Sequence, residues 1–191
     1  MTDLVFFTKL RAFFWIQATK FVGSFDEKRR WENPSTSLET FPLGSSWSPP
    51  LEGIMSLTVD GAATVAKAGW GGVLRDSSGN IRFLFSCPIS ALGSDYSELM
   101  AVHIGLDFFW EANWIDKTHL FVESDSELVV EWIKEKLQRP WRWWKILYDI
   151  DCLAAQIKHI KFQHIPREHN YLSDFLAKSG MYSSSSFKEW W

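Results

Sequence analysis

The order of hydrophobic patterns after residue 50 constrains the fold of this chain more than any other feature. Between Met55 and Asp60 apolar and polar residues alternate, which is typical of a strand with one polar face. Extended patterns follow over 66–75 and 81–89, joined by the turn-forming stretch 76–80. Three consecutive hairpin-linked strands are therefore expected, and they begin an antiparallel sheet.

From residue 94 onward, segments with helical periodicity alternate with short apolar segments. The expected helices cover 94–113, 126–137, 144–157 and 170–179, and the expected strands cover 119–123 and 161–165. Strands that alternate with helices pair in parallel, so the fold class is mixed α/β. Gly69, Gly71 and Gly72 indicate that another backbone approaches the second strand closely, and Gly180 is expected to end the last helix.

The first 50 residues differ in composition from the rest. An aromatic and basic segment is followed by a stretch rich in Ser, Pro and Thr, which closes at 47–50 with Trp-Ser-Pro-Pro. Such a composition is typical of loops and linkers. We therefore expect a weakly structured N-terminal segment and linker at 1–50, one domain at 51–180, and a C-terminal tail at 181–191.

Composition excludes several classes of protein. With 46% hydrophobic residues and a net charge of -3, the chain is not wholly disordered. Its two cysteines, Cys87 and Cys152, cannot form a disulfide framework or a zinc site, and they suit a reducing compartment. No apolar run approaches the roughly 20 residues of a membrane-spanning helix, and the start of the chain lacks a basic signal-peptide region. We expect a monomer that is not secreted and has no membrane partner, in the nucleus or the cytoplasm.

Four acidic residues lie where the chemistry of such a fold is expected. Asp60 ends the first strand on its polar face, Glu98 lies in the first turns of a helix, Asp125 follows the fourth strand, and Asp174 lies in the second turn of the last helix. The carboxyl ends of strands form the usual ligand edge of an open α/β sheet. Carboxylates gathered there repel one another unless a cation neutralises them, and Mg²⁺ suits such oxygen ligands.

Taken singly, each acid also has a purely structural interpretation. Asp95 and Glu98 match a capping box, in which Glu98 only covers a free backbone N–H. Ser124 and Glu127 match a second box, which leaves Asp125 as an acid near the positive end of a helix dipole. Asp60 fits an ordinary turn, and Asp174 fits a solvated helix face. Four acids in this order of elements favour a shared metal site over four separate explanations.

Six segments of the chain, in this order and spacing, resemble the type 1 ribonuclease H domain. They are LTVDGA at 57–62, GWGGVLRD at 69–76, SEL at 97–99, VESDS at 122–126, HIPREHN at 164–170 and SD at 173–174. The resemblance covers about residues 53–180 and is greatest to the plant version, akin to the ribonuclease H region of non-long-terminal-repeat retrotransposon polyproteins. The segment before the domain also resembles the corresponding part of those elements.

The resemblance implies a ribonuclease H-like fold with a five-stranded mixed sheet, three antiparallel strands then two parallel ones, flanked by helices. It implies an endonuclease that binds an RNA/DNA hybrid and cuts its RNA strand with two Mg²⁺ ions, with Mn²⁺ as an alternative metal. The catalytic and metal-binding carboxylates carried over from the family are Asp60, Glu98, Asp125 and Asp174. The substrate contacts expected with them are Gly61, Ala62, Arg167 and Asn170.

Two features depart from the family pattern. Some enzymes of the family have a loop histidine before the last acid that assists proton transfer or product release. Here that loop is short, and His169 is only a weak candidate for this role. The stretch RPWRWWK at 139–145 fits a substrate platform, because Arg and Trp suit phosphate contact and base stacking. It fits better as packing, in which Trp143 and Trp144 hold the third helix against the sheet, since only three basic residues lie in the run. Without a basic handle, we expect weak, salt-sensitive substrate binding.

Two functions remain after this reasoning, an active hybrid-specific ribonuclease and a domesticated, catalytically inactive module that binds nucleic acid or protein. The acidic pI of about 6.0 argues at first against nucleic acid. However, residues 51–191 hold fourteen basic and eighteen acidic residues, a balance of -4 that equals the four proposed ligands. Two Mg²⁺ ions would cancel this charge, so the acidic balance is compatible with a hybrid substrate.

Overall fold

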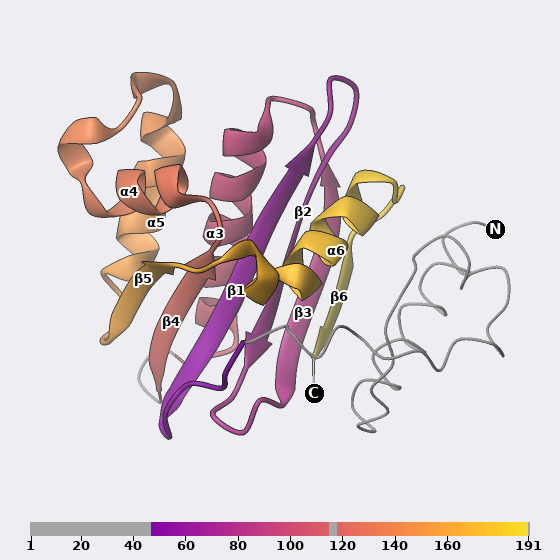
Figure 1. Cartoon of the computed structure of the whole chain (residues 1–191). Helices are drawn as coiled ribbons and strands as arrows, with labels where there is room; N and C mark the ends of the chain where they lie inside the picture. The colour runs from indigo at the N-terminus through magenta and orange to yellow at the C-terminus, as the bar shows by residue number, and fades with distance from the viewer. Residues whose placement is uncertain (1–46, 115–117, 191) are drawn as a thin grey trace, which may run out of the picture. The chain divides into compact units, whose positions relative to one another are not determined.

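A single six-stranded sheet organises the part of the chain that the structure describes (Figure 1). This computed structural model describes residues 47–114 and 118–190. The strands lie in the order β5-β4-β1-β2-β3-β6. Their bounds are β1 Ile54–Ala63, β2 Ala68–Arg75, β3 Ile81–Ile89, β4 His119–Ser124, β5 Ile160–His164 and β6 Phe187–Trp190. The expectation of a weakly structured segment at 1–50 lies almost entirely outside the described residues.

The strand directions confirm the mixed α/β class. β1, β2 and β3 pair as an antiparallel meander, β4 is parallel to β1, and β5 is parallel to β4. The expected number of five strands is wrong, because β6 pairs antiparallel with β3 where only a tail was expected. Its Trp190 ring stacks on Phe83 with the centroids 3.8 Å apart, and Phe187 is buried. Tertiary packing therefore makes a strand of four residues that show no strong strand pattern themselves.

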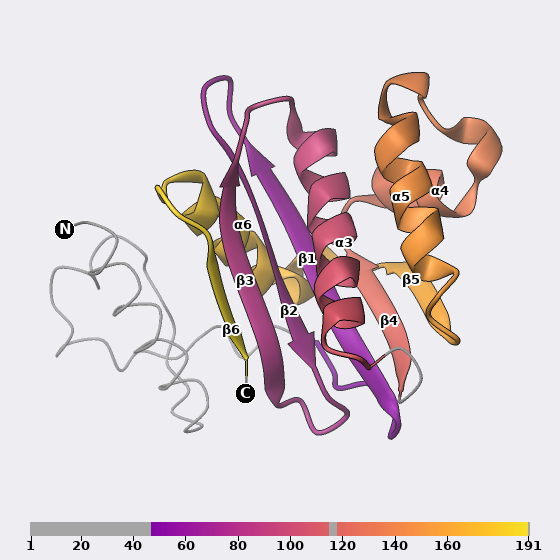
Figure 2. The ribbon, with the colours of Figure 1, turned by 180° about the vertical axis from the view of Figure 1, so that it is seen from behind.

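Helices cover both faces of this sheet. They are α3 Ser94–Glu111, α4 Glu127–Lys134, α5 Trp144–Ala154 and α6 Tyr171–Met181. Helix α6 lies on the face in front in Figure 1, whereas α3 lies on the opposite face, seen in front in Figure 2. No helix among the described residues is long and apolar enough to cross a membrane.

Alternate residues of β1 contact the two helices that cover the sheet. Leu57 packs towards Gly105 of α3, whereas the Thr58 hydroxyl accepts a hydrogen bond of 2.9 Å from Ser173 of α6. An apolar stripe of α3 is buried against the sheet; it consists of Leu99, Val102, Leu106 and Phe109. Because the side-chain period of a strand is two, Asp60 shares the α6-facing side with Thr58, and Gly61 lies on the α3 side.

Glycine allows α6 to approach the sheet at backbone distance. A Cβ at Gly71 would lie 2.6 Å from the Ala177 nitrogen, and a Cβ at Gly180 would lie 2.6 Å from the Cys87 carbonyl oxygen of β3. The expected close approach to the second strand is therefore confirmed. The expectation that Gly180 ends the last helix is wrong. Gly180 lies within α6, where its missing side chain makes room for β3.

We expect Gly180→Ala to destabilise the protein, although alanine is the better helix former. The added methyl group would push α6 away from β3, and overpacking of this kind costs about 1–3 kcal/mol. Urea unfolding measures the change in the free energy of unfolding. The half-buried Ser179→Ala in the same helix is the control and should change stability by less than about 0.5 kcal/mol. Equal effects of the two variants would contradict the packing role of Gly180.

Candidate metal centre

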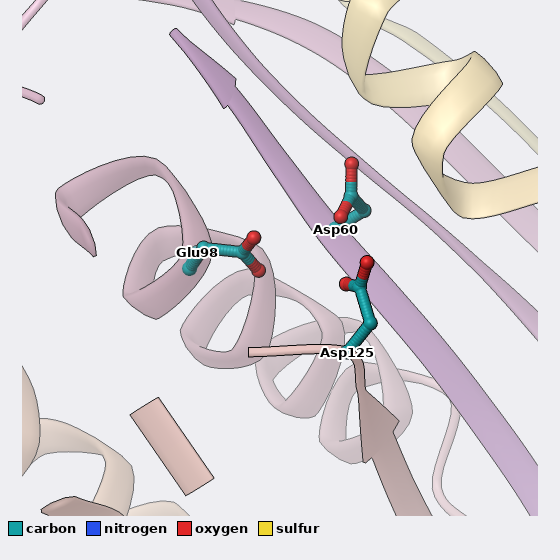
Figure 3. Close-up of side chains that lie close together, drawn as sticks. All are labelled: Asp60, Glu98 and Asp125. Carbon is teal, nitrogen blue, oxygen red and sulfur yellow. The ribbon is translucent and has the colours of Figure 1, made fainter. Parts of the chain in front are cut away.

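Three acidic side chains from distant parts of the chain converge at one end of β1 and β4. Asp60, Glu98 and Asp125 each place one carboxylate oxygen within 4.8 Å of the others (Figure 3). We call these three residues the acidic triad. Asp60 comes from β1, Glu98 from α3, and Asp125 follows β4 directly. The structure thus brings together three of the four acids predicted from the sequence.

Strand pairing explains why Asp60 and Asp125 meet. β4 pairs with β1 only as far as Thr58 opposite Glu123, so Asp60 and Asp125 both lie just beyond the last parallel pair. The expectation that Asp60 ends its strand is wrong, because pairing with β2 extends β1 to Ala63. The triad therefore sits at the edge where the parallel strand ends, which is the usual ligand edge of such sheets.

The position of Glu98 depends on the absence of a side chain at Gly61. A Cβ at Gly61 would collide with the backbone of Ser97 and Glu98, so α3 can lie directly against β1 at this point. The Glu98 carboxylate accepts a hydrogen bond from the Gly61 backbone, and the Ser124 hydroxyl lies 3.5 Å from its Oε2. Ser124 is a contact that the sequence did not indicate.

Asn170 connects the two aspartates of the triad. Its Nδ2 donates to the Val59 carbonyl oxygen at 2.8 Å and to Asp125 Oδ1 at 2.9 Å, and it lies 3.5 Å from Asp60 Oδ1. Asn170 is 1% exposed. Asn170, which the sequence predicts to contact substrate, is thus buried beside the Asp60 and Asp125 carboxylates.

Burial and the neighbouring carboxylates make Asp60 and Glu98 hold their protons strongly. The pKa of Asp60 is raised from 3.8 to about 10, first by burial and then by the charges of Glu98 and Asp125. The pKa of Glu98 is raised from 4.5 to about 8, again first by burial and then by Asp125. No lysine or arginine among the described residues forms an ion pair with the triad. Clustered oxygen ligands without a basic partner fit a hard divalent cation such as Mg²⁺.

Asp174, the fourth predicted acid, lies beside the triad rather than in it. It occupies the first turn of α6, where Lys178 Nζ lies 2.6 Å from its Oδ2 and Arg167 Nη2 lies 3.5 Å from its Oδ1. Its charge is still close enough to raise the pKa of Asp60 and of Glu98. Asp174 is therefore a neighbour of the triad that is held by two cations.

The other residues expected to contact substrate lie around this centre in different environments. Ala62 is half-buried in β1, and Arg167 is exposed in a short 3-10 turn before α6. The Arg167 side chain is 74% exposed and pairs with Asp174. Of the expected substrate contacts, Arg167 is thus the one whose side chain is largely open to solvent.

Neither predicted capping box forms. Helix α3 begins after Gly93 without a side-chain cap, and Asp95 instead forms an ion pair of 3.0 Å with Arg142. Helix α4 is capped by Ser126, whose hydroxyl accepts from the Val129 N–H at 3.4 Å. The capping-box interpretations of Glu98 and Glu127 are therefore wrong, whereas Asp125 does lie directly before the N-terminus of α4.

The aromatic and basic stretch before α5 is largely structural. Arg139 donates to the Trp132 and Ile133 carbonyl oxygens and to Asp151. Trp143 packs on Tyr96 of α3 with the ring centroids 5.1 Å apart, so packing is confirmed for Trp143, although against α3 rather than against the sheet.

Its neighbour Trp144 does not follow the packing interpretation. Trp144 is 62% exposed and stacks on Tyr148 of its own helix at 5.4 Å, so the prediction that it packs α5 against the sheet is wrong. Trp144 is the first residue of α5, directly after the 3-10 turn at Trp141–Trp143.

The histidines do not join the triad. His164 ends β5 with an exposed side chain, and His169 lies in the 3-10 turn at 167–169. The His119 and His159 rings contact each other at 4.1 Å. The described residues show no histidine in the acidic cluster.

A mixed sheet with α3 and α6 on opposite faces and carboxylates at the β1–β4 edge defines the ribonuclease H-like class of proteins. Within this class, the chain belongs to the family described as reverse transcriptase-like, whose family model matches residues 58–180. The resemblance found in the sequence is thereby confirmed.

Individual relatives agree with this assignment. The chain is 29% identical over 143 residues to an Arabidopsis thaliana protein named "Putative ribonuclease H protein At1g65750", a match that covers 74% of this chain and 23% of that protein. The chain thus spans about a quarter of the length of this curated relative.

Solved structures show the same fold. The RNase H1 of the halophilic archaeon Halobacterium salinarum matches with a TM-score of 0.62 and 20% identity, over 67% of this chain and 97% of that one. The compost-derived LC11-RNase H1, solved in complex with an RNA/DNA hybrid, matches with a TM-score of 0.60 and 25% identity, over 66% and 96%. A foamy viral protease-reverse transcriptase, also solved with an RNA/DNA hybrid, matches with a TM-score of 0.60 and 20% identity, over 72% of this chain and 22% of that one.

Proposed function

We propose that this protein is an endoribonuclease that cleaves the RNA strand of RNA/DNA hybrids with the help of two divalent metal ions, Mg²⁺ in the first place. The acidic triad carries the proposal, because three partly or fully buried carboxylates gathered at one place, which raise the pKa of Asp60 and of Glu98, are costly unless they bind a cation. Two of the relatives above were solved with an RNA/DNA hybrid bound, which supports this class of substrate.

Each acid would have a distinct part in holding the metals. Asp60, Glu98 and Asp125 would form the core of the ligand set, and Asp174 would join it from α6. The cations that pair with Asp174 can turn away, since the Arg167 and Lys178 side chains are 74% and 47% exposed. When bound, paired metals supply charge stabilisation for the attacking and leaving oxygens of a phosphodiester. The sheet edge and α3 contribute by holding the carboxylates in a fixed arrangement.

The surface around the triad suits a hybrid backbone. We propose that the half-buried Ala62 adds little bulk beside the metals and that the exposed Arg167 pairs with a phosphate. Gly61, which faces α3, would contribute through its backbone and through the position of Glu98. Recognition by 2′-hydroxyls and helix shape predicts little dependence on base sequence. Since the domain lacks a basic surplus, binding should be weak and salt-sensitive.

The proposal is tested with a hybrid whose RNA strand is labelled. With Mg²⁺ or Mn²⁺ we expect internal RNA fragments from the hybrid and none from double-stranded RNA or DNA. The matched control is Glu127→Gln, which removes one exposed acid near the site without touching the triad. It should cleave within about twofold of the unchanged protein, since exposed substitutions rarely perturb a fold.

The same assay separates the active enzyme from its alternative. Binding of the hybrid without cleavage, under both metals, would instead support a catalytically inactive nucleic-acid-binding module. Absence of both binding and cleavage would leave a protein-binding role as the better explanation. A monomeric state and a nuclear or cytoplasmic location are further proposals, which size-exclusion chromatography and fluorescent tagging test.

A further inference from the structure

We infer that Asn170 is a positioning residue, whose side-chain amide fixes the spacing of Asp60 and Asp125 so that the acidic triad can bind a divalent metal. This inference rests on the proposed metal centre and gives Asn170 a different role from the substrate contact expected from the sequence. It is argued from hydrogen bonds, burial and the chemistry of the amide.

The Asn170 amide contacts both aspartates of the triad and the strand that carries one of them. Its Nδ2 lies 2.9 Å from Asp125 Oδ1 and 3.5 Å from Asp60 Oδ1, and it also donates to the Val59 carbonyl oxygen at 2.8 Å. These contacts join residues 45 and 111 positions away in the sequence. One side chain therefore links the loop after β4 to β1.

The backbone of Asn170 also supports the fourth acid. The Asp174 N–H donates to the Asn170 carbonyl oxygen at 3.0 Å, in the first turn of α6. Asn170 thus contacts Asp60 and Asp125 with its side chain and Asp174 with its main chain. A change in its position would alter the geometry of three proposed ligands together.

The chemistry of an amide suits this task better than that of a charged group. An amide nitrogen carries two N–H groups and no charge, so it can hold the Val59 carbonyl oxygen and Asp125 Oδ1, with Asp60 Oδ1 at a longer 3.5 Å, without competing with a cation for the carboxylates. A lysine at this place would neutralise the aspartates and weaken metal binding. Partners that orient metal ligands from behind commonly change metal affinity by about 10–100-fold when they are removed.

The amide is held in this orientation at a cost to stability. Its Oδ1 is buried and has no hydrogen-bond partner among the described residues. Such a buried, unpaired acceptor is unfavourable. The reverse orientation would place Oδ1 against two carboxylates, so the carboxylates determine which end of the amide faces them. Burial at 1% exposure also keeps the side chain away from a substrate backbone.

The test compares Asn170→Ala with Ser173→Ala in the full-length protein. Both residues are buried at the start of α6 and donate a side-chain hydrogen bond to β1, but Ser173 donates to Thr58 and not to a carboxylate. Titration calorimetry with MnCl₂ alone measures metal affinity without any nucleic acid. We expect the dissociation constant for Mn²⁺ to rise about 10–100-fold in Asn170→Ala and less than about twofold in Ser173→Ala, while both variants lose several degrees of melting temperature.

Each outcome decides the inference. Unchanged Mn²⁺ affinity in folded Asn170→Ala, an equal loss of affinity in Ser173→Ala, or no Mn²⁺ binding by the unchanged protein would overturn it. If Asn170→Ala does not fold, Asn170→Ser replaces it, because its shorter hydroxyl leaves room for a water at Val59; the same rise in the dissociation constant is expected. Weakened Mn²⁺ binding in a protein that cleaves no hybrid would support the positioning role and count against the proposed function, so the two can fail separately.

Discussion

Asp60→Asn should abolish cleavage of an RNA/DNA hybrid and, in the absence of metal, make the protein more stable. Loss of activity of at least about 10³-fold is expected, because the substitution removes the most buried acid of the triad from the metal site. The protein gains stability because the raised pKa of Asp60 means that its carboxylate must take up a proton on folding at neutral pH, a cost that the uncharged asparagine does not have. A rise of about 2–8 °C corresponds to 1–2 kcal/mol in a domain of this size.

Two measurements on the same preparation check this prediction. Hybrid cleavage is followed at saturating Mg²⁺, and melting is followed by calorimetry in the presence of a chelator. Glu127→Gln removes the same charge from an exposed position and should change neither quantity appreciably. Retained cleavage by Asp60→Asn would refute the metal assignment, and a lower melting temperature would show that the triad stabilises the metal-free fold.

Metal-free protein should lose stability as the pH rises from about 5.5 to about 8.5, and Mg²⁺ should remove most of this loss. In the folded state the pKa of Asp60 is about 10 and that of Glu98 is about 8, against ordinary values of 3.8 and 4.5. Over this window the folded chain therefore binds more protons than the unfolded chain, and stability falls with rising pH. Each such group contributes a slope of up to about 1.4 kcal/mol per pH unit.

The pH dependence of stability can be assigned to Asp60 and Glu98 by comparison with an acid that titrates outside this pH window. The pKa of Asp151 is lowered to about 2, first by its hydrogen bond to Arg139, so this residue titrates below the window. Melting temperatures are measured at several pH values with chelator and with excess Mg²⁺. Asp60→Asn should flatten the chelator curve, and a stability that rises with pH in the metal-free protein would contradict the proposed repulsion.

Strong local patterns made most of the fold predictable. β3 has the expected bounds, and β4 is one residue longer, because apolar runs between turn residues mark these strands clearly. β6 was missed because its four residues carry little pattern, and its pairing depends on Phe83, far away in the sequence. The helix expected at 126–137 ends at Lys134, and the chain continues as a 3-10 turn at 136–138.

The candidate site was predictable in its ligands but not in its support. Acids beside strand ends indicated the triad, because the ends of neighbouring parallel strands meet at one edge. The hydrogen bond from Asn170 to Val59 spans 111 positions, and local periodicity contains no information about such a contact. Likewise, the sequence did not indicate that Lys178 pairs with Asp174, since opposite charges four residues apart are common on solvated helices.

Gly61 has a consequence for judging whether a mutated copy of this sequence keeps the proposed metal centre. Inspection of such a copy would ordinarily count its acids and accept it when all four are present. A copy with a side chain at position 61 would pass that inspection, yet its α3 would have to retreat from β1 and take Glu98 with it. A substitution at a residue with no reactive group can therefore disrupt the proposed metal centre while all four acids are retained, and position 61 belongs in any such inspection.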